Sequence, residues 1–556
     1  MPEKTISRIT FACVLALVIL AFSLPAALAQ TQTQDVQAVI AEVFEETVSV
    51  RGLDADPNIP VNYLTREELE ARMLEDFAED NPEEELEDAQ GIMVMLGFIE
   101  PDLDLEDFYI AMLTEQIAGF YDPEDNGLYL ISESQSMSAM DRYTLSHEFV
   151  HYLQDQNFDL MRPPFYDPDD IEVPTDDDSS FAATCLVEGD AVLTSENWLM
   201  AYMDAEDMMD MYSESEEYSS DILDSAPEYI YESLLFPYME GADFVRYIYE
   251  EGGFDAIDKA FDNPPSTTEQ IYHPEKYIEG EGAIEVELED ISSKLGGGWI
   301  LDYENVLGEF DVYQLFAPYF SDIDDVETAA GGWGGNRYHY YTSGDGEELL
   351  VQAYAWDSEK DAQEFAAAYA QYLKGRFGGE LEKEQPAGSW MIWSSDDYML
   401  GLKRNGLNTE LVQATATEPL EAAIAALGEE GDAIDEGALE VETDGEGEGE
   451  TDLSVLIIAL VIGLLALGII LVIVMLLMFR RSPPPPAQPP MGPSGPYYYG
   501  PPGGGSGGDA GPYAGGPGAG PPPPTPQGGQ VPSPPTQAPP VPGTQEPRPP
   551  EATPGE

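Results

Sequence analysis

The sequence predicts an α+β protein. Its larger domain is mainly helical with a small β-hairpin or sheet, and a second, smaller α+β domain, one transmembrane helix and a disordered tail follow. Three observations predict this class. Helical apolar patterns dominate the chain as far as about residue 264. Strand-like patterns become frequent only after about residue 298. An uncharged apolar run over 453–479 then precedes a segment rich in Pro and Gly.

The N-terminus has the pattern of a secretory signal peptide. Lys4 and Arg8 stand before and at the start of an apolar stretch, and the small residues around Ala29 offer a cleavage site before Gln30. We therefore expect residues 1–29 to be removed. The alternative is an N-terminal anchor that is not cleaved.

The next part of the chain alternates helical patterns with acidic connectors. Residues 91–99 have the composition of a buried helix. The period changes over 117–132, where two short apolar runs flank the sequence PEDNG, and this pattern predicts a β-hairpin. A helix over about 139–156 follows, and Ser138 with Asp141 has the spacing of a capping box.

Two further apolar helical segments come next, over 181–203 and, with a break at a Gly-Gly pair, over 234–264. From about residue 298 a strand over 348–356 precedes an amphipathic helix. A structural turn is predicted at Trp333, Gly334, Gly335 and Arg337, with a binding loop as the alternative. The predicted division is 1–29 signal peptide, 30–297 larger domain, 298–425 smaller α+β domain, 426–452 acidic Gly/Glu stalk, 453–479 transmembrane helix and 480–556 disordered tail.

The apolar run 453–479 is long enough to cross a bilayer. Acidic residues precede it and Arg480 and Arg481 follow it, so the positive-inside rule places the C-terminus in the cytoplasm. Together with the signal peptide, this predicts a single-pass type I protein of the cell membrane with residues 30–452 outside. The Pro-rich tail over 480–556 is a candidate docking segment for a cytoplasmic partner.

The chain is strongly acidic, with a formal net charge of −87. Basic and acidic residues outside 30–452 balance, so the region 30–452 carries this charge. Such a negative field repels nucleic acid and anionic lipid, which excludes nucleic acid as a partner. Two explanations of the acidity remain open. One is a solvated, salt-adapted surface, which its spread along the chain favours; the other is cation capture, for example by the acidic loop 166–180.

Residues 146–155, SHEFVHYLQD, contain two of the four histidines. On the predicted helix, His147, His151 and Asp155 stand at i, i+4 and i+8 and share one face. Two imidazoles on one side of a helix can bind one zinc ion, with Glu148 beside them as the general base for a water molecule. Asp155, one turn beyond His151, is a candidate carboxylate for orienting that imidazole.

A catalytic zinc ion needs three protein ligands and one open position. The candidate third ligand is Glu188, because a carboxylate within the apolar stretch FAATCLVEGDAVL is costly unless it is paired or bound to a metal. The alternative is a glutamate whose tip reaches solvent. Asp190 points elsewhere on the same helix and is a candidate orienting or capping group.

HEFVH at 147–151, with Glu188 on a following helix, resembles the gluzincin class of zinc metallopeptidases. The segments AGFYDP, HEFVHYLQDQNFDL, LVEGDA, STTEQIYHPEKY and GGWGGNRYHYY resemble more closely a poorly characterised group of prokaryotic, often membrane-anchored proteins. The resemblance implies a zincin-like fold for the larger domain, zinc ligands at His147, His151 and Glu188, and a general base at Glu148. In thermolysin-like enzymes an Asp lies four residues after the glutamate ligand, whereas this chain has Val192 there.

Peptide hydrolysis also needs a group that stabilises the oxyanion. His273 is the candidate, with Tyr272 and Tyr277 as alternatives, and a structural histidine before Pro274 is an equal possibility. The sequence thus predicts a membrane-anchored, extracytoplasmic zinc metallopeptidase acting on peptides or proteins. The competing hypothesis is a non-catalytic cell-surface binding or scaffold protein with a structural or vestigial metal site. Glu148 argues against it, because a structural zinc site needs no general base.

Overall fold

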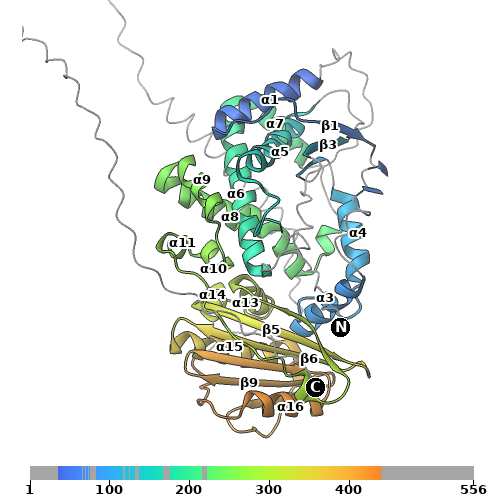
Figure 1. Cartoon of the computed structure of the whole chain (residues 1–556), viewed down its shortest axis with the longest axis vertical. Helices are drawn as coiled ribbons and strands as arrows, with labels where there is room; N and C mark the ends of the chain where they lie inside the picture. The colour runs from blue at the N-terminus through green and yellow to red at the C-terminus, as the bar shows by residue number, and fades with distance from the viewer. Residues whose placement is uncertain are drawn as a thin grey trace, which may run out of the picture. The chain divides into compact units, whose positions relative to one another are not determined.

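The computed structural model describes most of the chain between residues 36 and 439 (Figure 1). The described residues are 36–65, single positions as far as 74, 83–116, 119–123, 126–131, 137–166, 176–215 and 222–439. The predicted signal peptide, transmembrane helix and tail, and the end of the predicted stalk, lie outside them.

No helix in the described ranges is both long enough and apolar enough to cross a membrane. This finding contradicts the predicted localisation, a single-pass type I membrane protein with an outer region and a cytoplasmic tail, and we correct that prediction. The run 453–479, on which the prediction was based, is among the residues that the structure does not describe.

The larger part of the described chain is built from helices. The main ones are α1 (Val36–Arg51), α5 (Ala139–Phe158), α6 (Asp177–Tyr202) and α8 (Glu228–Gly252). Helices α6 and α8 pack most closely where two glycines meet, because a Cβ on Gly189 would lie 2.2 Å from the carbonyl oxygen of Gly241. Shorter helices complete this part: α3 (Glu83–Leu96), α4 (Leu105–Gln116), α7 (Ala205–Ser215), α9 (Phe254–Asp262), α10 (Thr268–Tyr272), α11 (Pro274–Glu279) and α12 (Ser292–Leu295).

A small three-stranded sheet lies among these helices, in the order β1-β3-β2. Strands β2 (Gly119–Asp122) and β3 (Gly127–Ile131) form an antiparallel hairpin within the predicted segment 117–132. Asn126 takes a positive φ of 50° in the turn, a conformation that Asn tolerates better than most residues. Strand β1 (Val61–Leu64) pairs in parallel with β3.

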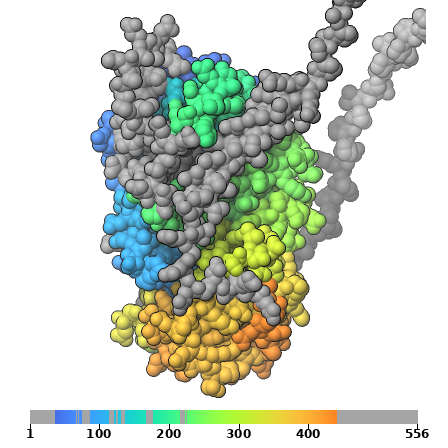
Figure 2. Space-filling view, turned by 180° about the vertical axis from the view of Figure 1, so that it is seen from behind, coloured from blue at the N-terminus to red at the C-terminus, as the bar shows by residue number. Residues whose placement is uncertain are grey.

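The C-terminal part contains a seven-stranded antiparallel sheet in the order β4-β5-β6-β10-β9-β8-β7. The strands are β4 (Trp299–Asn305), β5 (Trp333–Ser343), β6 (Glu348–Trp356), β7 (Glu382–Lys383), β8 (Met391–Ser394), β9 (Met399–Asn405) and β10 (Asn408–Ala414). Helices α13 (Glu309–Phe316), α14 (Ile323–Ala330), α15 (Glu359–Phe377) and α16 (Thr417–Leu427) pack around it. In Figure 2, which views the molecule from behind, the orange residues of this part fill one end.

Both faces of this sheet are buried. Along β6, Leu350 and Tyr354 belong to the hydrophobic core that includes α15, whereas Leu349 and Val351 belong to the core that includes α16. Successive side chains of a strand point to opposite faces, so one strand contributes to both cores. This arrangement explains why a sequence pattern of alternating polar and apolar residues is weak here.

The structure therefore corrects the predicted fold class. The described residues form a mixed α+β arrangement with a seven-stranded antiparallel sheet, and no zincin fold is shown. The predicted turn or binding loop at Trp333, Gly334, Gly335 and Arg337 lies within strand β5. The glycines at 331–335 indicated a turn, but the backbone of Gly335 instead lies against Ile284, where a Cβ would come within 2.1 Å of the Ile284 carbonyl oxygen.

Helix α3 joins the helical part to the sheet. The carbonyl oxygen of Met95 accepts hydrogen bonds from Arg376 at 2.7 Å and from Gln413 at 2.7 Å, and that of Leu96 accepts one from Tyr372 at 2.8 Å. Carbonyl groups at the C-terminal end of a helix have no partner within the helix, and here these side chains supply the missing hydrogen bonds. Figure 2 shows the light-blue residues near position 100 directly beside the yellow and orange residues of the sheet.

A cavity of about 80 Å³ lies in the seam between the helical part and the sheet. Its walls include Asp177 and Asp311, which are half-buried, and Asp178, which is buried. Burial raises the pKa of Asp177 to about 7 and that of Asp311 to about 6, and it raises the pKa of Asp178 well above its usual value. We call this space the seam cavity.

Replacing Asp177 with Asn should stabilise the protein more at high pH than at low pH. The folded protein keeps a proton on Asp177 up to about pH 7, whereas the unfolded chain loses it near the ordinary pKa of 3.8. The stabilising effect of this proton is therefore present at low pH and lost as the pH rises to about 7. We expect Asp177→Asn to raise the free energy of unfolding by about 1–2 kcal/mol at about pH 8 and by less at about pH 4.

Urea unfolding followed by circular dichroism at the two pH values measures this difference. Asp345→Asn, in the exposed turn between β5 and β6, is the control and should show no comparable pH dependence. If Asp177→Asn changed the free energy of unfolding by the same amount at both pH values, the raised pKa of Asp177 would be contradicted.

Candidate metal centre

Helix α5 carries the HEFVH segment and begins at a capping box. The Ser138 hydroxyl accepts a hydrogen bond from the Asp141 backbone N–H at 3.1 Å, and the Asp141 carboxylate accepts one from the Ser138 N–H at 2.8 Å. Phe149 and Leu153 are fully buried in a hydrophobic core on one face of α5. Because that face is held by the core, the two histidines point to a different neighbour, helix α6.

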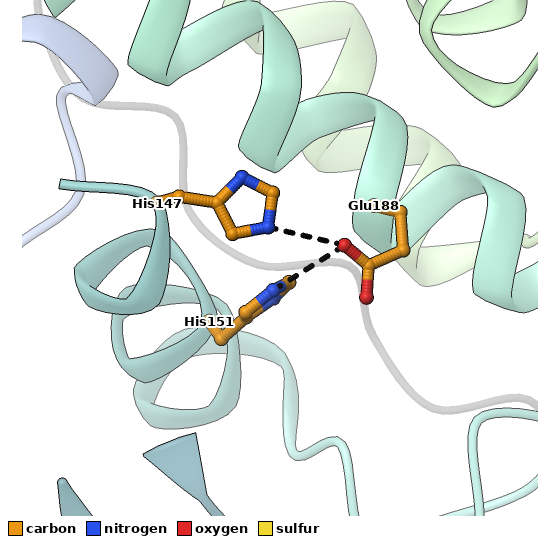
Figure 3. A group of neighbouring side chains, drawn as sticks. All are labelled: His147, His151 and Glu188. Atoms are coloured by element: carbon orange, nitrogen blue, oxygen red, sulfur yellow. Dashed lines mark hydrogen bonds and ion pairs between the residues drawn. The ribbon is translucent and has the colours of Figure 1, made fainter. Parts of the chain in front are cut away.

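His147 and His151 meet Glu188 across the α5–α6 contact (Figure 3). Glu188 Oε2 lies 3.2 Å from His147 Nε2 and 3.5 Å from His151 Nε2. The candidate ligand atoms of the three residues all lie within 4.8 Å of one another. The three side chains are buried, with relative exposures of 5% for His147 and 1% each for the other two. The structure thus brings together the three residues that the sequence predicted as ligands.

The cluster has an electrostatic asymmetry. Burial lowers the pKa of His147, so this imidazole is neutral. Burial also opposes a charge on His151, but the carboxylate of Glu188 outweighs it and raises the pKa of His151. Burial likewise opposes a charge on Glu188, and His151 outweighs it and lowers the pKa of Glu188. The buried Glu188 carboxylate therefore needs a positive partner, which is either protonated His151 or a metal ion.

Glu148 lies beside the three-residue cluster and is almost fully buried. Its Oε2 atom accepts a hydrogen bond from the backbone N–H of Tyr121 in strand β2 at 3.0 Å. Its Oε1 atom is buried without a hydrogen-bond partner among the described residues. Burial raises the pKa of Glu148 to about 7. One oxygen is therefore anchored by the hairpin and the other is free to accept a proton.

A chain of buried polar contacts begins at His151 Nδ1, the ring nitrogen that does not face Glu188. His151 Nδ1 lies 3.0 Å from Gln154 Oε1, and Gln154 Nε2 donates to Asp190 Oδ2 at 3.0 Å. Arg51 Nε donates to Asp190 at 2.8 Å, and the Arg51 guanidinium also lies 2.8 Å from Asp258. Because Gln154 Oε1 can only accept, His151 carries its proton on Nδ1 when neutral and presents the lone pair of Nε2 to the cluster.

Two residues predicted to assist the site have other partners. Asp155 accepts hydrogen bonds from the Tyr121 hydroxyl at 2.8 Å and from the Leu160 N–H at 3.1 Å, and the contact that orients His151 comes from Gln154 instead. Asp190 does reach the site, but through Gln154.

His273, predicted as the oxyanion-stabilising residue, pairs with Glu309 at 3.1 Å and is partly exposed. Among the hydrogen bonds and ion pairs of the described residues, it has none with the three-residue cluster. The pKa of His273 is raised, mainly because of its hydrogen bond to Glu309. The neighbouring candidate Tyr277 donates to the carbonyl oxygen of Asn263.

Tyr238 on α8 was not predicted and lies against the cluster. Its ring stacks on His147 with a centroid distance of 6.2 Å and an interplanar angle of 29°. Burial, together with the charges of Glu188 and Glu148, raises the pKa of the Tyr238 phenol well above its usual value. The phenol therefore keeps its proton and can donate a hydrogen bond in the site. Its position depends on the packing of α8 against α6, for which the sequence around Tyr238 carries no signal.

The donor set fits a divalent transition metal. Two neutral imidazoles and one carboxylate are ligands typical of a catalytic zinc ion. His151 Nε2 and Glu188 Oε1 are buried without hydrogen-bond partners among the described residues. Both atoms therefore have lone pairs that could bind a metal ion. The described chain has a second cluster of acidic side chains, Glu269, Glu281 and Asp357. Lys276 supplies its positive charge, because Lys276 Nζ lies within 2.8 Å of a carboxylate oxygen of each.

Comparison with protein families finds one match, to a domain of unknown function, DUF8575, over residues 300–424. This segment covers the seven-stranded sheet and ends before the last residues of α16. Comparisons with curated proteins and with solved structures find no match for the chain.

Replacing Glu188 with Ala should remove most of the metal affinity of the protein. The change deletes the only carboxylate of the three-residue cluster and leaves two neutral imidazoles. We expect wild-type protein to bind one zinc ion and the variant to bind it at least about 100-fold more weakly, since loss of a ligand costs more than loss of its supporting contacts. Zinc titration of the metal-free full chain by calorimetry measures both affinities.

The control is Glu196→Ala, on the same helix, where the carboxylate is 44% exposed and pairs with Arg246. It should leave the zinc affinity unchanged. Full zinc affinity in Glu188→Ala would remove Glu188 from the ligand set.

Replacing Arg51 with Met should destabilise the fold strongly. Arg51 is buried, and its loss leaves the Asp190 carboxylate, also fully buried, without a cation. Breaking a buried ion pair by removing one partner costs about 3–5 kcal/mol. The matched variant Arg246→Met breaks a pair that is 38–44% exposed and should cost less than about 1 kcal/mol. Urea unfolding distinguishes them, and equal losses would contradict the role of Arg51.

Proposed function

We propose that the protein is a zinc-dependent metallopeptidase. The observation that supports this best is the convergence of His147, His151 and Glu188 on one point, with Glu148 beside them. The resemblance of HEFVH and the later Glu188 to gluzincin metallopeptidases agrees with this proposal. His147, His151 and Glu188 would hold the ion. When bound there, zinc supplies a Lewis acid that polarises a carbonyl group and lowers the pKa of a water ligand.

Glu148 has the position of a general base. The hydrogen bond from Tyr121 fixes one carboxylate oxygen, so the free Oε1 atom has a defined orientation. In the proposed reaction Oε1 takes a proton from the attacking water and later passes it to the leaving amine. Anchoring the carboxylate to the backbone of β2 reduces the reorganisation that this transfer requires.

Tyr238 is the best-placed donor to the oxyanion. It keeps its proton in the buried site and stacks on His147, one of the proposed ligands. Among the described residues His273 has no hydrogen bond or ion pair with the cluster, and its ring is held by Glu309. We therefore assign oxyanion stabilisation to Tyr238 in preference to His273.

The burial of the three ligands is also compatible with a structural metal site in a non-catalytic binding protein. A structural zinc site is usually closed by four protein ligands. Here three candidate ligands converge, and the Glu148 carboxylate beside them is anchored by the backbone N–H of Tyr121. This arrangement favours the catalytic alternative.

Replacing Glu148 with Gln should abolish peptide hydrolysis and preserve metal binding. Gln has nearly the same shape but cannot accept the proton, and general-base catalysis is worth about 100- to 10,000-fold in rate. The measurement is cleavage of a quenched fluorogenic peptide library by the zinc-loaded full chain. Zinc content and circular dichroism check that the site and the fold are intact.

Glu196→Gln is the matched variant on α6 and should cleave like the wild type. If the wild type binds zinc stoichiometrically but cleaves nothing, the structural alternative is correct. Unchanged cleavage by Glu148→Gln would refute the assigned base.

A further inference from the structure

The seam cavity is large enough to hold a ligand group. A single water molecule needs about 10–15 Å³ of such space, so a volume of about 80 Å³ exceeds what one trapped water requires. The walls come from both parts of the fold, with α3, α6 and α8 on one side and β4, β5 and α13 on the other.

Most of the wall is apolar. Ile92 and Met93 come from α3, Phe181 from α6 and Phe310 from α13. Three tyrosine rings, Tyr229, Tyr303 and Tyr338, add aromatic surface. Such walls favour an aliphatic or aromatic body over a hydrated ion.

Three carboxylates line the same cavity, and their hydrogen bonds come from neutral groups. Asp311 accepts from the Tyr229 hydroxyl and the Gly308 N–H, each at 2.8 Å. Asp178 accepts from the N–H and the hydroxyl of Thr268, both on Oδ1. Asp177 accepts from the Tyr303 hydroxyl at the long distance of 3.4 Å. Within the described chain, no ion pair joins any of the three to Lys, Arg or His.

Two other buried carboxylates of the described chain have a Lys or Arg partner. Asp190 pairs with Arg51, and Glu269 pairs with Lys276. The cavity differs from these two sites, because its three neighbouring acids have only neutral donors. Burying carboxylates in this way is unfavourable unless they are protonated or meet a positive charge.

We propose that the seam cavity binds an organic cation, an ammonium or guanidinium group on an apolar stem. The stem would lie against the Phe and Met side chains, and the cation would lie at Asp177 and Asp311. An anion is excluded by the three acids, and a hydrated metal ion is disfavoured by the apolar walls. This binding site is separate from the metal centre and does not depend on the proposed peptidase activity.

Two sources could supply this chemistry, a free alkylammonium compound or the side chain of Lys in a peptide. The second source has a geometric basis. Phe181 and Glu188 are seven residues apart on α6, so they lie on nearly the same face about 10 Å apart along the axis. A peptide three or four residues long spans that distance when extended.

The test is calorimetric titration of the full chain with n-hexylammonium chloride and with n-hexanol. These probes have the same stem and differ in charge. At about pH 8, where Asp177 and Asp311 can ionise, we expect hexylammonium to bind at least about tenfold more tightly than hexanol, as for a charge-assisted hydrogen bond.

Two variants separate charge from space. Asp177→Asn should remove the tenfold preference for hexylammonium, whereas Asp345→Asn, in an exposed turn, should keep it. Ala89→Phe, which fills the cavity from α3, should weaken both probes. Equal affinity for the two probes, no binding of hexylammonium, or an unchanged preference in Asp177→Asn would overturn the proposal.

A competition experiment distinguishes the two sources. Hexapeptides that contain one Lys or one norleucine, its uncharged counterpart, are added to protein loaded with hexylammonium. Displacement by the Lys peptide alone identifies a peptide side chain as the occupant. Hexylammonium that is retained against both peptides identifies a free small cation. Displacement by both peptides to the same extent would contradict recognition of charge.

Discussion

The candidate metal centre depends on the packing of helix α6 against several helices at one point. Three consecutive residues of α6 have different roles there. Glu188 reaches the histidines of α5, Gly189 allows α8 to approach, and Asp190 binds Arg51 at the end of α1. Successive residues of a helix are turned by about 100°, so each of the three points to a different neighbour. A larger side chain at Gly189 would push α8 away and move Tyr238 with it.

Scarcity of positive charge shapes the interior of this protein. The chain has 21 basic and 108 acidic side chains, so each buried cation matters. Arg51 stabilises the Asp190 carboxylate beside the candidate metal centre, and Lys276 pairs with three carboxylates near the sheet. The three-residue cluster and the seam cavity have no Lys or Arg of their own in the described structure. At the cluster a proton on His151 meets the carboxylate, and in the cavity burial raises the pKa of the acids.

Local signals in the sequence were sufficient for the core of the site. The i, i+4 spacing of His147 and His151 and the unusual carboxylate at Glu188 identified residues that lie together. The capping box at Ser138 and the hairpin before α5 were equally local. Arg51 and Tyr238 could not be found in this way, because their roles arise from contacts between helices that are distant in sequence. Gln154 has a local spacing to His151, but its bond to Asp190 joins two helices. Asp155 had the right spacing to support His151, but Tyr121 binds it instead.

The larger sheet was hardest to predict for a related reason. Strand β5 is covered on both faces, so it lacks the alternation that indicates a strand, and its glycines indicated a turn. Strand β6 is covered in the same way, but it has the bounds of the strand predicted over 348–356. The zincin-like fold that the resemblance implied is not shown, and the sheet lies in the region from residue 298 that was predicted as a smaller α+β domain. A motif of five residues specifies local chemistry, and its surroundings are specified by the rest of the chain.

The end of helix α3 links the assembly of the fold to the order in which the chain is made. Its last carbonyl groups are bound by residues 276–318 positions further along the sequence. Contacts of such separation form late, because a long loop must close before they can contribute. Helix α3 forms one wall of the seam cavity, and Gln413 binds the carbonyl oxygen of Met95 at its end. During synthesis from the N-terminus, this contact can form only after Gln413 has left the ribosome. The helical part can begin to fold earlier, but the cavity is completed only when nearly all of the described chain has been made.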